Sequence, residues 1–132
     1  MFKFFLITFI FSSNFLDFSF FKSVKADSHK SLLLEGIEKI ESTDYSGALD
    51  DINDFLKQYP TNWEAYYHRG VSKNNLSDYE GAKSDFSKSI ELNPNLWAPS
   101  FNGRGFSKQM LGDHNCAISD FTKSIELDPG RS

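Results

Sequence analysis

The sequence predicts an all-α fold made of three tandem pairs of antiparallel helices. Ten residues at 85–94, DFSKSIELNP, return almost unchanged at 120–129 as DFTKSIELDP. Around each copy a glycine, an alanine and a proline stand at fixed intervals, and the same ladder is found a third time upstream. Apolar side chains between these markers recur at helical spacing. A period of 34 to 35 residues that holds two helical stretches is typical of a repeat protein.

The first segment of the chain, residues 1–26, differs from the rest. It contains nine of the fourteen Phe residues and has a Lys followed by an uncharged run at residues 4–11. Val24 and Ala26 have the modest size that a signal peptidase requires, so we expect a signal peptide that is cleaved before Asp27. The repeats would then lie outside the cytoplasm, in a periplasm, in a lumen or as a secreted protein.

An uncleaved membrane anchor at residues 4–21 is the alternative for this segment. Asp17 weighs against it, because a carboxylate near the centre of a bilayer costs about 2.5–3.5 kcal/mol. An anchor would also leave the repeats outside the cytoplasm, but bound to the membrane.

Residues 27–132 are predicted to form the repeat domain, with repeats at 29–62, 63–96 and 98–131 and Trp97 as an insertion. We expect the glycine and the alanine of each ladder where two helices approach closely, since a larger side chain would push them apart. The proline cannot continue a helix, because it lacks an amide hydrogen. The ladder residues are Gly36, Ala48 and Pro60; Gly70, Ala82 and Pro94; and Gly105, Ala117 and Pro129.

The second repeat shows the expected elements most clearly. Its first helix carries apolar or small residues at helical spacing, and NLSDYE then interrupts the pattern. Asp78 is placed to cap the next helix, which buries Ala82 and Phe86 and ends before Pro94. The first repeat is the least regular, because His29 and Lys30 make a poor helix start.

These residues resemble the tetratricopeptide repeat, and the resemblance covers residues 29–131. Besides the ladder, the matching residues are Trp63, Tyr79, Phe86 and Phe121. The resemblance implies that the helix pairs stack into a right-handed superhelix, an α-solenoid. Its concave face, lined by the first helix of each pair, binds extended peptides or partner helices.

One position departs from the family pattern in all three repeats. The family usually has a second small residue, Ala, in the later helix, and this chain has Phe55, Ser89 and Ser124 there. Phe55 is large enough that we expect adjusted packing in the first repeat.

Three rows of residues are predicted to cross the concave face: Leu33, Tyr67 and Asn102; Ile37, Val71 and Phe106; and Ile40, Asn74 and Gln109. All except Ile40 are candidate contact residues for a partner. The three amides would offer donors and acceptors to its backbone. The alternative for the apolar members, above all Leu33 and Ile37, is that they fill gaps in the core. Some family members clamp an acidic C-terminal peptide with Lys and Asn, but Leu33 and Ile37 occupy that place here, so that activity is not expected.

Charge and composition exclude several function classes. Outside residues 1–26 the chain has 14 − 3 = 11 basic and 18 − 1 = 17 acidic residues, a net charge of −6, which does not favour nucleic acid. No His, Cys and Asp cluster has metal-ligand spacing, and there is no nucleophile elbow or phosphate-binding glycine loop. We therefore expect no enzyme activity, no metal and no cofactor. Cys116 is the only cysteine, and we expect it to be semi-buried and unreactive.

Arg69 and Arg104 occupy the same position in successive repeats. They are predicted to form structural salt bridges with acids of a neighbouring second helix, such as Asp51 and Asp85, and the alternative is ligand binding.

The sequence thus predicts an exported protein–protein interaction module or assembly scaffold that binds a peptide segment or helix. The alternative is a permanent structural or regulatory subunit of a larger membrane-associated complex. Self-association through the last helix, around residues 117–127, is also predicted, because no further helix of this sequence covers its outer face. The apolar side chains concerned are Ile118, Phe121, Ile125 and Leu127.

Overall fold

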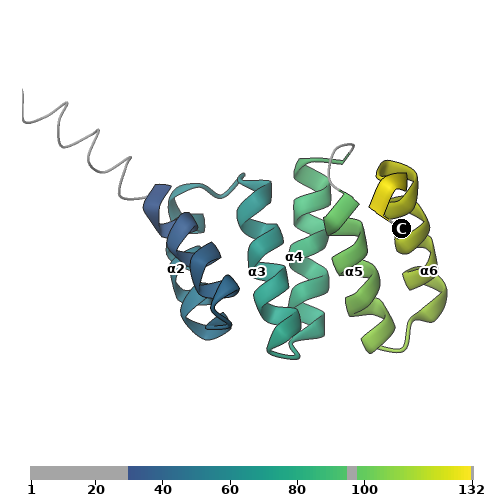
Figure 1. The fold of residues 1–132 in the computed structure, drawn as a ribbon, viewed down its shortest axis with the longest axis horizontal. Helices are drawn as coiled ribbons and strands as arrows, with labels where there is room; N and C mark the ends of the chain where they lie inside the picture. Colours follow the sequence, from purple (N-terminus) through teal and green to yellow (C-terminus); the bar gives the residue numbers. More distant parts are fainter. Residues whose placement is uncertain (1–29, 95–97, 132) are drawn as a thin grey trace, which may run out of the picture. The chain divides into compact units, whose positions relative to one another are not determined.

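Helices are the only regular elements in the residues that a computed structural model of the chain describes, 30–94 and 98–131. The array belongs to the compact unit Leu32–Ser132 (Figure 1). The predicted signal peptide lies outside the described residues. After an opening helix at residues 30–41, the elements are α2 (Tyr45–Gln58), α3 (Trp63–Asn75), α4 (Tyr79–Leu92), α5 (Ala98–Met110), α6 (His114–Leu127) and the short 3₁₀ helix η1 (Pro129–Arg131). The predicted all-α repeat fold is confirmed.

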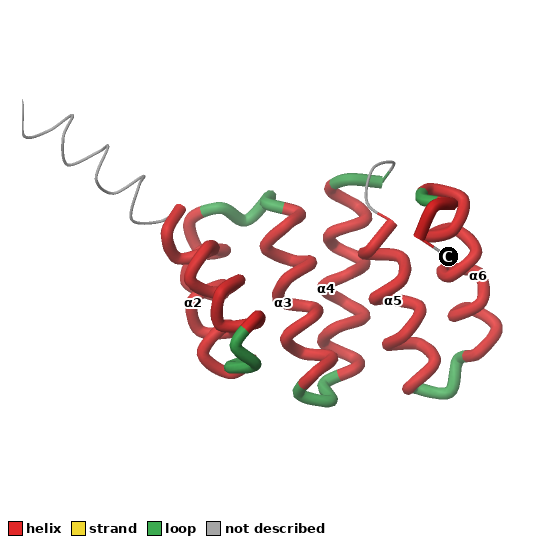
Figure 2. Tube along the Cα trace, in the orientation of Figure 1, coloured by secondary structure: helices red, strands yellow, loops and turns green. Residues whose placement is uncertain are grey.

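Each helix packs against the next one along the chain. Contacts join α2 to α3, α3 to α4, α4 to α5 and α5 to α6. Figure 2 shows the α2–α3 loop at one end of the helices and the α3–α4 and α5–α6 loops at the other. Because consecutive helices are neighbours, the first and second helices of one pair and the facing helices of two pairs share a continuous buried interior.

The turn inside each pair is built in the same way. Asp44, Asp78 and Asp113 are the N-caps of α2, α4 and α6, and each carboxylate accepts a hydrogen bond from the backbone N–H three residues later. Such a bond satisfies one of the amides that a helix start leaves without an intrahelical partner. The cap predicted at Asp78 is confirmed.

The residue just before each cap has a left-handed backbone. Its φ is 67° at Thr43, 64° at Ser77 and 85° at Gly112. Glycine adopts this conformation at little cost, whereas a side chain with a Cβ is strained there by roughly 1–2 kcal/mol. The first two turns therefore keep a strain that the third avoids.

The ladder residues lie at the closest contacts within each pair. A Cβ added to Gly36 would lie 2.8 Å from Ile52 Cγ1, and one added to Gly70 would lie 3.0 Å from the Phe86 ring. The ladder alanines of α2, α4 and α6 are all buried. Each ladder proline follows its helix end by two residues.

The position where Phe55 departs from the family pattern is packed differently in successive interfaces. Phe55 is buried with Ala65 in the cluster between α2 and α3, and its ring stacks on Tyr59 with centroids 4.7 Å apart. Between α4 and α5 the equivalent residues, Ser89 and Ser100, share a buried hydrogen bond of 2.8 Å. Phe55 beside Ala65 thus takes the place that two small polar side chains, Ser89 and Ser100, have in the next interface. This is the adjusted packing expected from the size of Phe55.

Candidate interaction groove

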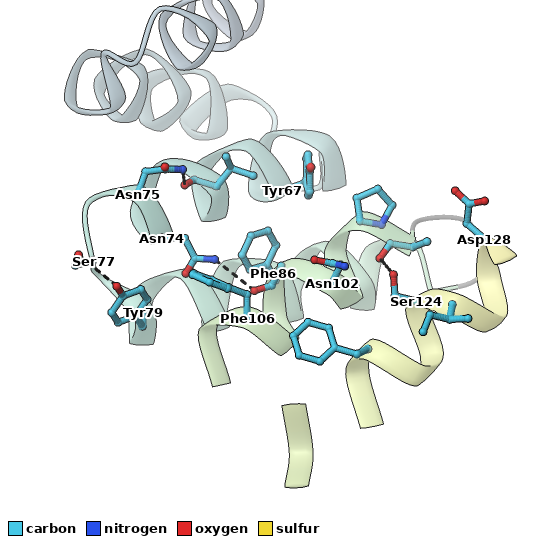
Figure 3. A pocket seen from close by; sticks show the side chains of 16 residues that line it. Tyr67, Asn74, Asn75, Ser77, Tyr79, Phe86, Asn102, Phe106, Ser124 and Asp128 are labelled. Carbon is cyan, nitrogen blue, oxygen red and sulfur yellow. Dashed lines mark hydrogen bonds between the residues drawn. The ribbon is translucent and has the colours of Figure 1, made fainter. Parts of the chain in front are cut away.

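A groove of about 930 Å³ lies across α3, α4, α5 and α6 (Figure 3). Five of the predicted contact residues line it: Tyr67, Val71, Asn74, Asn102 and Phe106. The first helices of two pairs therefore bring together the part of the predicted surface that belongs to the second and third repeats.

The other three predicted contact residues lie elsewhere. Leu33 is only 8% exposed and belongs to the buried cluster of the first pair, and Ile37 packs against that cluster, as the core-filling alternative expects. Gln109 is exposed near the end of α5 and does not line the groove. Leu33 is removed from the contact surface, since a buried side chain offers no area to a partner.

The floor of the groove is the ring of Phe86. This side chain is 1% exposed and lies beneath two helix backbones. A Cβ on Gly103 of α5 would be 2.4 Å from Phe86 Cζ, and a Cβ on Gly70 of α3 would be 3.0 Å from the same ring. The two glycines thus let α3 and α5 approach the ring from both sides. Tyr67 continues the aromatic surface, with its ring centroid 5.9 Å from that of Phe86.

One wall of the groove is an aromatic pair from two repeats. Tyr79 at the start of α4 meets Phe106 of α5 edge to face, with centroids 6.3 Å apart. Phe106 remains 41% exposed. Because Tyr79 supports one side of the Phe106 ring, the ring offers apolar area to a partner.

Some polar side chains of the groove form hydrogen bonds within the protein, and others remain available to a partner. Asn74 donates to the carbonyl of Gly103 at 3.3 Å and accepts from the hydroxyl of Ser107 at 2.8 Å, so it braces α3 against α5. Asn75 donates to the carbonyl of Val71 at 2.9 Å. Asn102 is exposed, and its side-chain amide makes no hydrogen bond to a described residue. The side-chain amide of Asn74, predicted to be available to a partner, thus forms hydrogen bonds within the protein. The side-chain amide of Asn102 remains available to a partner, as expected.

The basic residues of α3 are held on the interior of the second pair. The Asp85 carboxylate accepts from Arg69 Nε and Nη2 at 2.8 and 2.7 Å and from Lys73 Nζ at 2.8 Å. The hydrogen bond to Asp85 raises the pKa of Arg69. Arg69 also donates from Nη1 to Asn53 Oδ1 in α2 at 2.9 Å, so one side chain ties two repeats together.

The third pair repeats this arrangement. Asp120 accepts from Arg104 at 2.8 and 2.7 Å and from Lys108 at 2.8 Å, and Arg104 reaches back to Ser87 Oγ in α4 at 3.3 Å. Burial alone would raise the pKa of the Asp120 carboxyl, but the hydrogen bonds from Arg104 and Lys108 outweigh it and hold the pKa below its usual value. Charge-assisted bidentate pairs of this kind are among the stronger hydrogen bonds in proteins.

The structural salt bridge predicted for Arg69 is confirmed with Asp85, while the suggested partner Asp51 instead pairs with Lys39 at 2.6 Å. Arg104 pairs with Asp120 and not with Asp85. The reason is that each arginine faces the acid 16 residues further along, on the second helix of its own pair. In the first pair, Glu35 occupies the position of the arginine.

Cys116 corrects another expectation, because its side chain is exposed and not semi-buried. It lies in the first turn of α6, where its backbone N–H donates to the Asp113 cap. Its hydrogen bond to the Asp113 carboxylate raises the pKa of the thiol, which disfavours the reactive thiolate.

No three His, Cys, Asp or Glu side chains in the described ranges 30–94 and 98–131 are grouped to hold a metal ion. A search of the same ranges found no helix with the length and apolar character needed to span a bilayer.

The stacked helical pairs and the open groove define a helical-repeat protein of the kind that mediates protein–protein contacts. Residues 63–96 match the family model described as "Tetratricopeptide repeat". The chain thus contains a tetratricopeptide repeat at residues 63–96, and proteins built from this repeat are generally interaction modules.

Solved structures with the same fold include three informative ones. MamA from AMB-1 is 26% identical with a TM-score of 0.70, and the match covers 79% of this chain and 56% of that one. The first tetratricopeptide domain of Spaghetti (RPAP3), bound to the HSP90 peptide SRMEEVD, is 21% identical with a TM-score of 0.74, covering 78% and 81%. The Arabidopsis OM64 domain is 17% identical with a TM-score of 0.76, covering 79% and 85%. The chain thus spans just over half of that MamA structure. No curated protein sequence matches this chain.

Several residues of the groove are not among the sequence-based candidates. Ser77, Tyr79, Ile125 and Asp128 line it from a turn and from the second helices. A concave face predicted from the first helices alone does not include these residues, because they lie in a turn, on second helices or just beyond one. For Ser77 and Tyr79 the tight turn after α3 is a usable sequence signal, since it brings the start of α4 beside the end of α3.

Proposed function

We propose that this chain is an exported interaction module or assembly scaffold that binds a peptide segment or a helix of a partner protein in the groove. The observation that carries the proposal is the combination of the exposed Phe106 ring with the open amide of Asn102, one turn apart on α5. A partner would cover the apolar ring while its backbone bonds to the amide. A likeness to the peptide-bound Spaghetti domain supports this use of the fold.

The test is capture of partners from the native host, with the mature chain as bait and with two groove variants, Phe106→Ala and Asn102→Ala. Met110→Ala is the matched control, because Met110 is 49% exposed on the same helix but does not line the groove. Loss of an anchoring aromatic contact costs about 2 kcal/mol or more, so capture should fall at least roughly tenfold for Phe106→Ala. Circular dichroism checks that the variants are folded. Unchanged capture by both groove variants would exclude the groove as the binding site.

Export is a further part of the proposal and is supported by the composition of residues 1–26. The mature chain would begin at Asp27, and a retained membrane anchor is the alternative. The intact mass of the protein isolated from its native host distinguishes the two. A mass that includes residues 1–26 would contradict cleavage.

The outer side of α6 favours self-association as a second role. Ile118 on this side of α6 is 62% exposed and does not line the groove. No helix of the described residues covers this side of α6. We propose that it docks against a second copy of the chain, since paired burial removes both apolar surfaces from water.

Light scattering over a wide concentration range tests this second role. Ile118→Lys introduces the residue that the second repeat has at this position, Lys83. The substitution should therefore leave the fold intact and abolish association. A wild-type chain that stays monomeric at every concentration would refute the proposal.

A further inference from the structure

The charges of the groove are unusually one-sided. Among the described residues that line it there is no Lys, Arg or His, and the one ionisable carboxylate is that of Asp128. A partner segment with its own carboxylates would find no cation to replace the water that it loses on binding.

Nearby cations are not available for that purpose. Every Lys and Arg of α3 and α5 donates to Asp85 or to Asp120 within its own helix pair. Moving one of them into the groove would deprive a nearly buried aspartate of one of its two cations, which costs more than a surface contact returns.

Asp128 lies at one end of the groove, and the Tyr79–Phe106 pair lies at the other, with Asn102 between them (Figure 3). Its carboxylate makes no ion pair with a side chain that the structure describes. Asp128 is also the C-cap of α6, where the unbonded carbonyls of the helix end add partial negative charge. This end of the groove therefore attracts a cation, and the net charge of −6 outside residues 1–26 strengthens the attraction at long range.

We infer that the groove selects a partner segment that is apolar or aromatic, carries no acidic residue within the groove, and places a Lys or Arg against Asp128. The inference rests on the proposed function and specifies its partner. The aromatic side chain of the segment packs on Phe106, its backbone bonds to Asn102, and its cation meets the carboxylate at the end of α6.

The test is a selection from a random library of twelve-residue peptides displayed on phage, with the full mature chain as the target. Phe106→Ala serves as the counter-target, so that only peptides that depend on the groove are counted. We expect enrichment of aromatic residues and of Lys and Arg, with depletion of Asp and Glu. The Asp128→Lys variant should lose the preference for basic peptides, whereas Glu126→Lys, which makes the same charge change on α6 outside the groove, should keep it.

Affinity measurements on the most enriched peptide complete the test. Replacement of its basic residue by Glu should weaken binding to the wild type about tenfold at low salt, and the difference should shrink as salt is raised. Groove-dependent peptides that are acidic, or that bind Asp128→Lys as well as the wild type, would overturn the inference and leave the proposed function standing. A selection that yields no peptide sensitive to Phe106→Ala would instead overturn both.

Discussion

Gly103 offers the sharpest test of how the repeats are packed. It lies inside α5, and a Cβ at this position would be 2.4 Å from Cζ, 2.6 Å from Cε1 and 2.9 Å from Cε2 of Phe86. Phe86 is 1% exposed, and the backbone at Gly70 limits its ring from the α3 side. An Ala at position 103 must therefore displace either the Phe86 ring or α5.

The expected magnitude is the difference between two effects. Ala in place of Gly in a helix interior stabilises the helix by about 1 kcal/mol. Overpacking a rigid core costs about 1–3 kcal/mol, and the contact at Gly103 is far closer than van der Waals distance, so the upper part of that range applies. We expect Gly103→Ala to lower the free energy of unfolding by roughly 1–2 kcal/mol and the melting temperature by roughly 5–12 °C.

Thermal and urea unfolding followed by circular dichroism measures this change. Gly70→Ala is the matched control, since it contacts the same ring at 3.0–3.2 Å and should cost less. In the double variant Gly103→Ala, Phe86→Leu, a smaller side chain replaces the ring. This variant should recover part of the lost free energy of unfolding, because the two substitutions act on one contact. A Gly103→Ala variant as stable as the wild type would refute the close packing of α5 on Phe86.

Three further predictions concern charge, pH and turn strain. Asp120→Asn leaves the Arg104 and Lys108 cations without a counter-charge and should lower stability by about 2–3 kcal/mol near neutral pH in urea unfolding. Because the folded pKa of Asp120 is lowered, its contribution is present above its usual pKa and is lost as the pH falls below about 4, so wild type and variant should converge in acid. Burial lowers the pKa of His68 to about 4, so the stability from its neutral form is complete above 6.5 and is lost as the pH falls toward 4. We expect that loss to be roughly 1–2 kcal/mol for this partly exposed group and to be absent in His68→Gln; identical pH profiles would contradict the assignment. Thr43→Gly relieves the strain of a left-handed backbone and should raise the free energy of unfolding by about 0.5–1 kcal/mol. Gly112→Ala should lower it by a similar amount. Changes of the opposite sign would exclude strain at the residue before the N-cap.

The fold could be predicted because its signals are local and repeated. The Gly, Ala and Pro ladder marks close approaches and helix ends, and a cap such as Asp78 satisfies amides within one turn of itself. Three copies of the same spacing remove the ambiguity that a single helix pattern has.

The contacts between helices are less predictable, because they depend on how two helices approach in space. Arg69 reaches Asp85 in its own pair, although Asp51 has the same type of side chain one repeat earlier. Gly103 has no signal in the repeat pattern, since the equivalent residue of the second repeat is His68.

The groove shows the same limit. Phe106 and Asn102 follow from the periodicity of a first helix, and both line the groove. Asn74 has the same periodicity but bonds to Gly103 and Ser107, which only the distance between α3 and α5 determines. Asp128 lines it from beyond the end of a second helix, so a pattern restricted to first helices does not include it.

We propose that the groove between α3 and α5 receives a partner segment. An NMR titration of the ¹⁵N-labelled mature chain with the captured partner segment tests it most directly. We expect the largest shift changes at the backbone amides of Val71 and Phe106 and at the side-chain amide of Asn102, and we expect Phe106→Ala to abolish them. Changes confined to residues outside the groove, such as the exposed side of α2, would contradict the account.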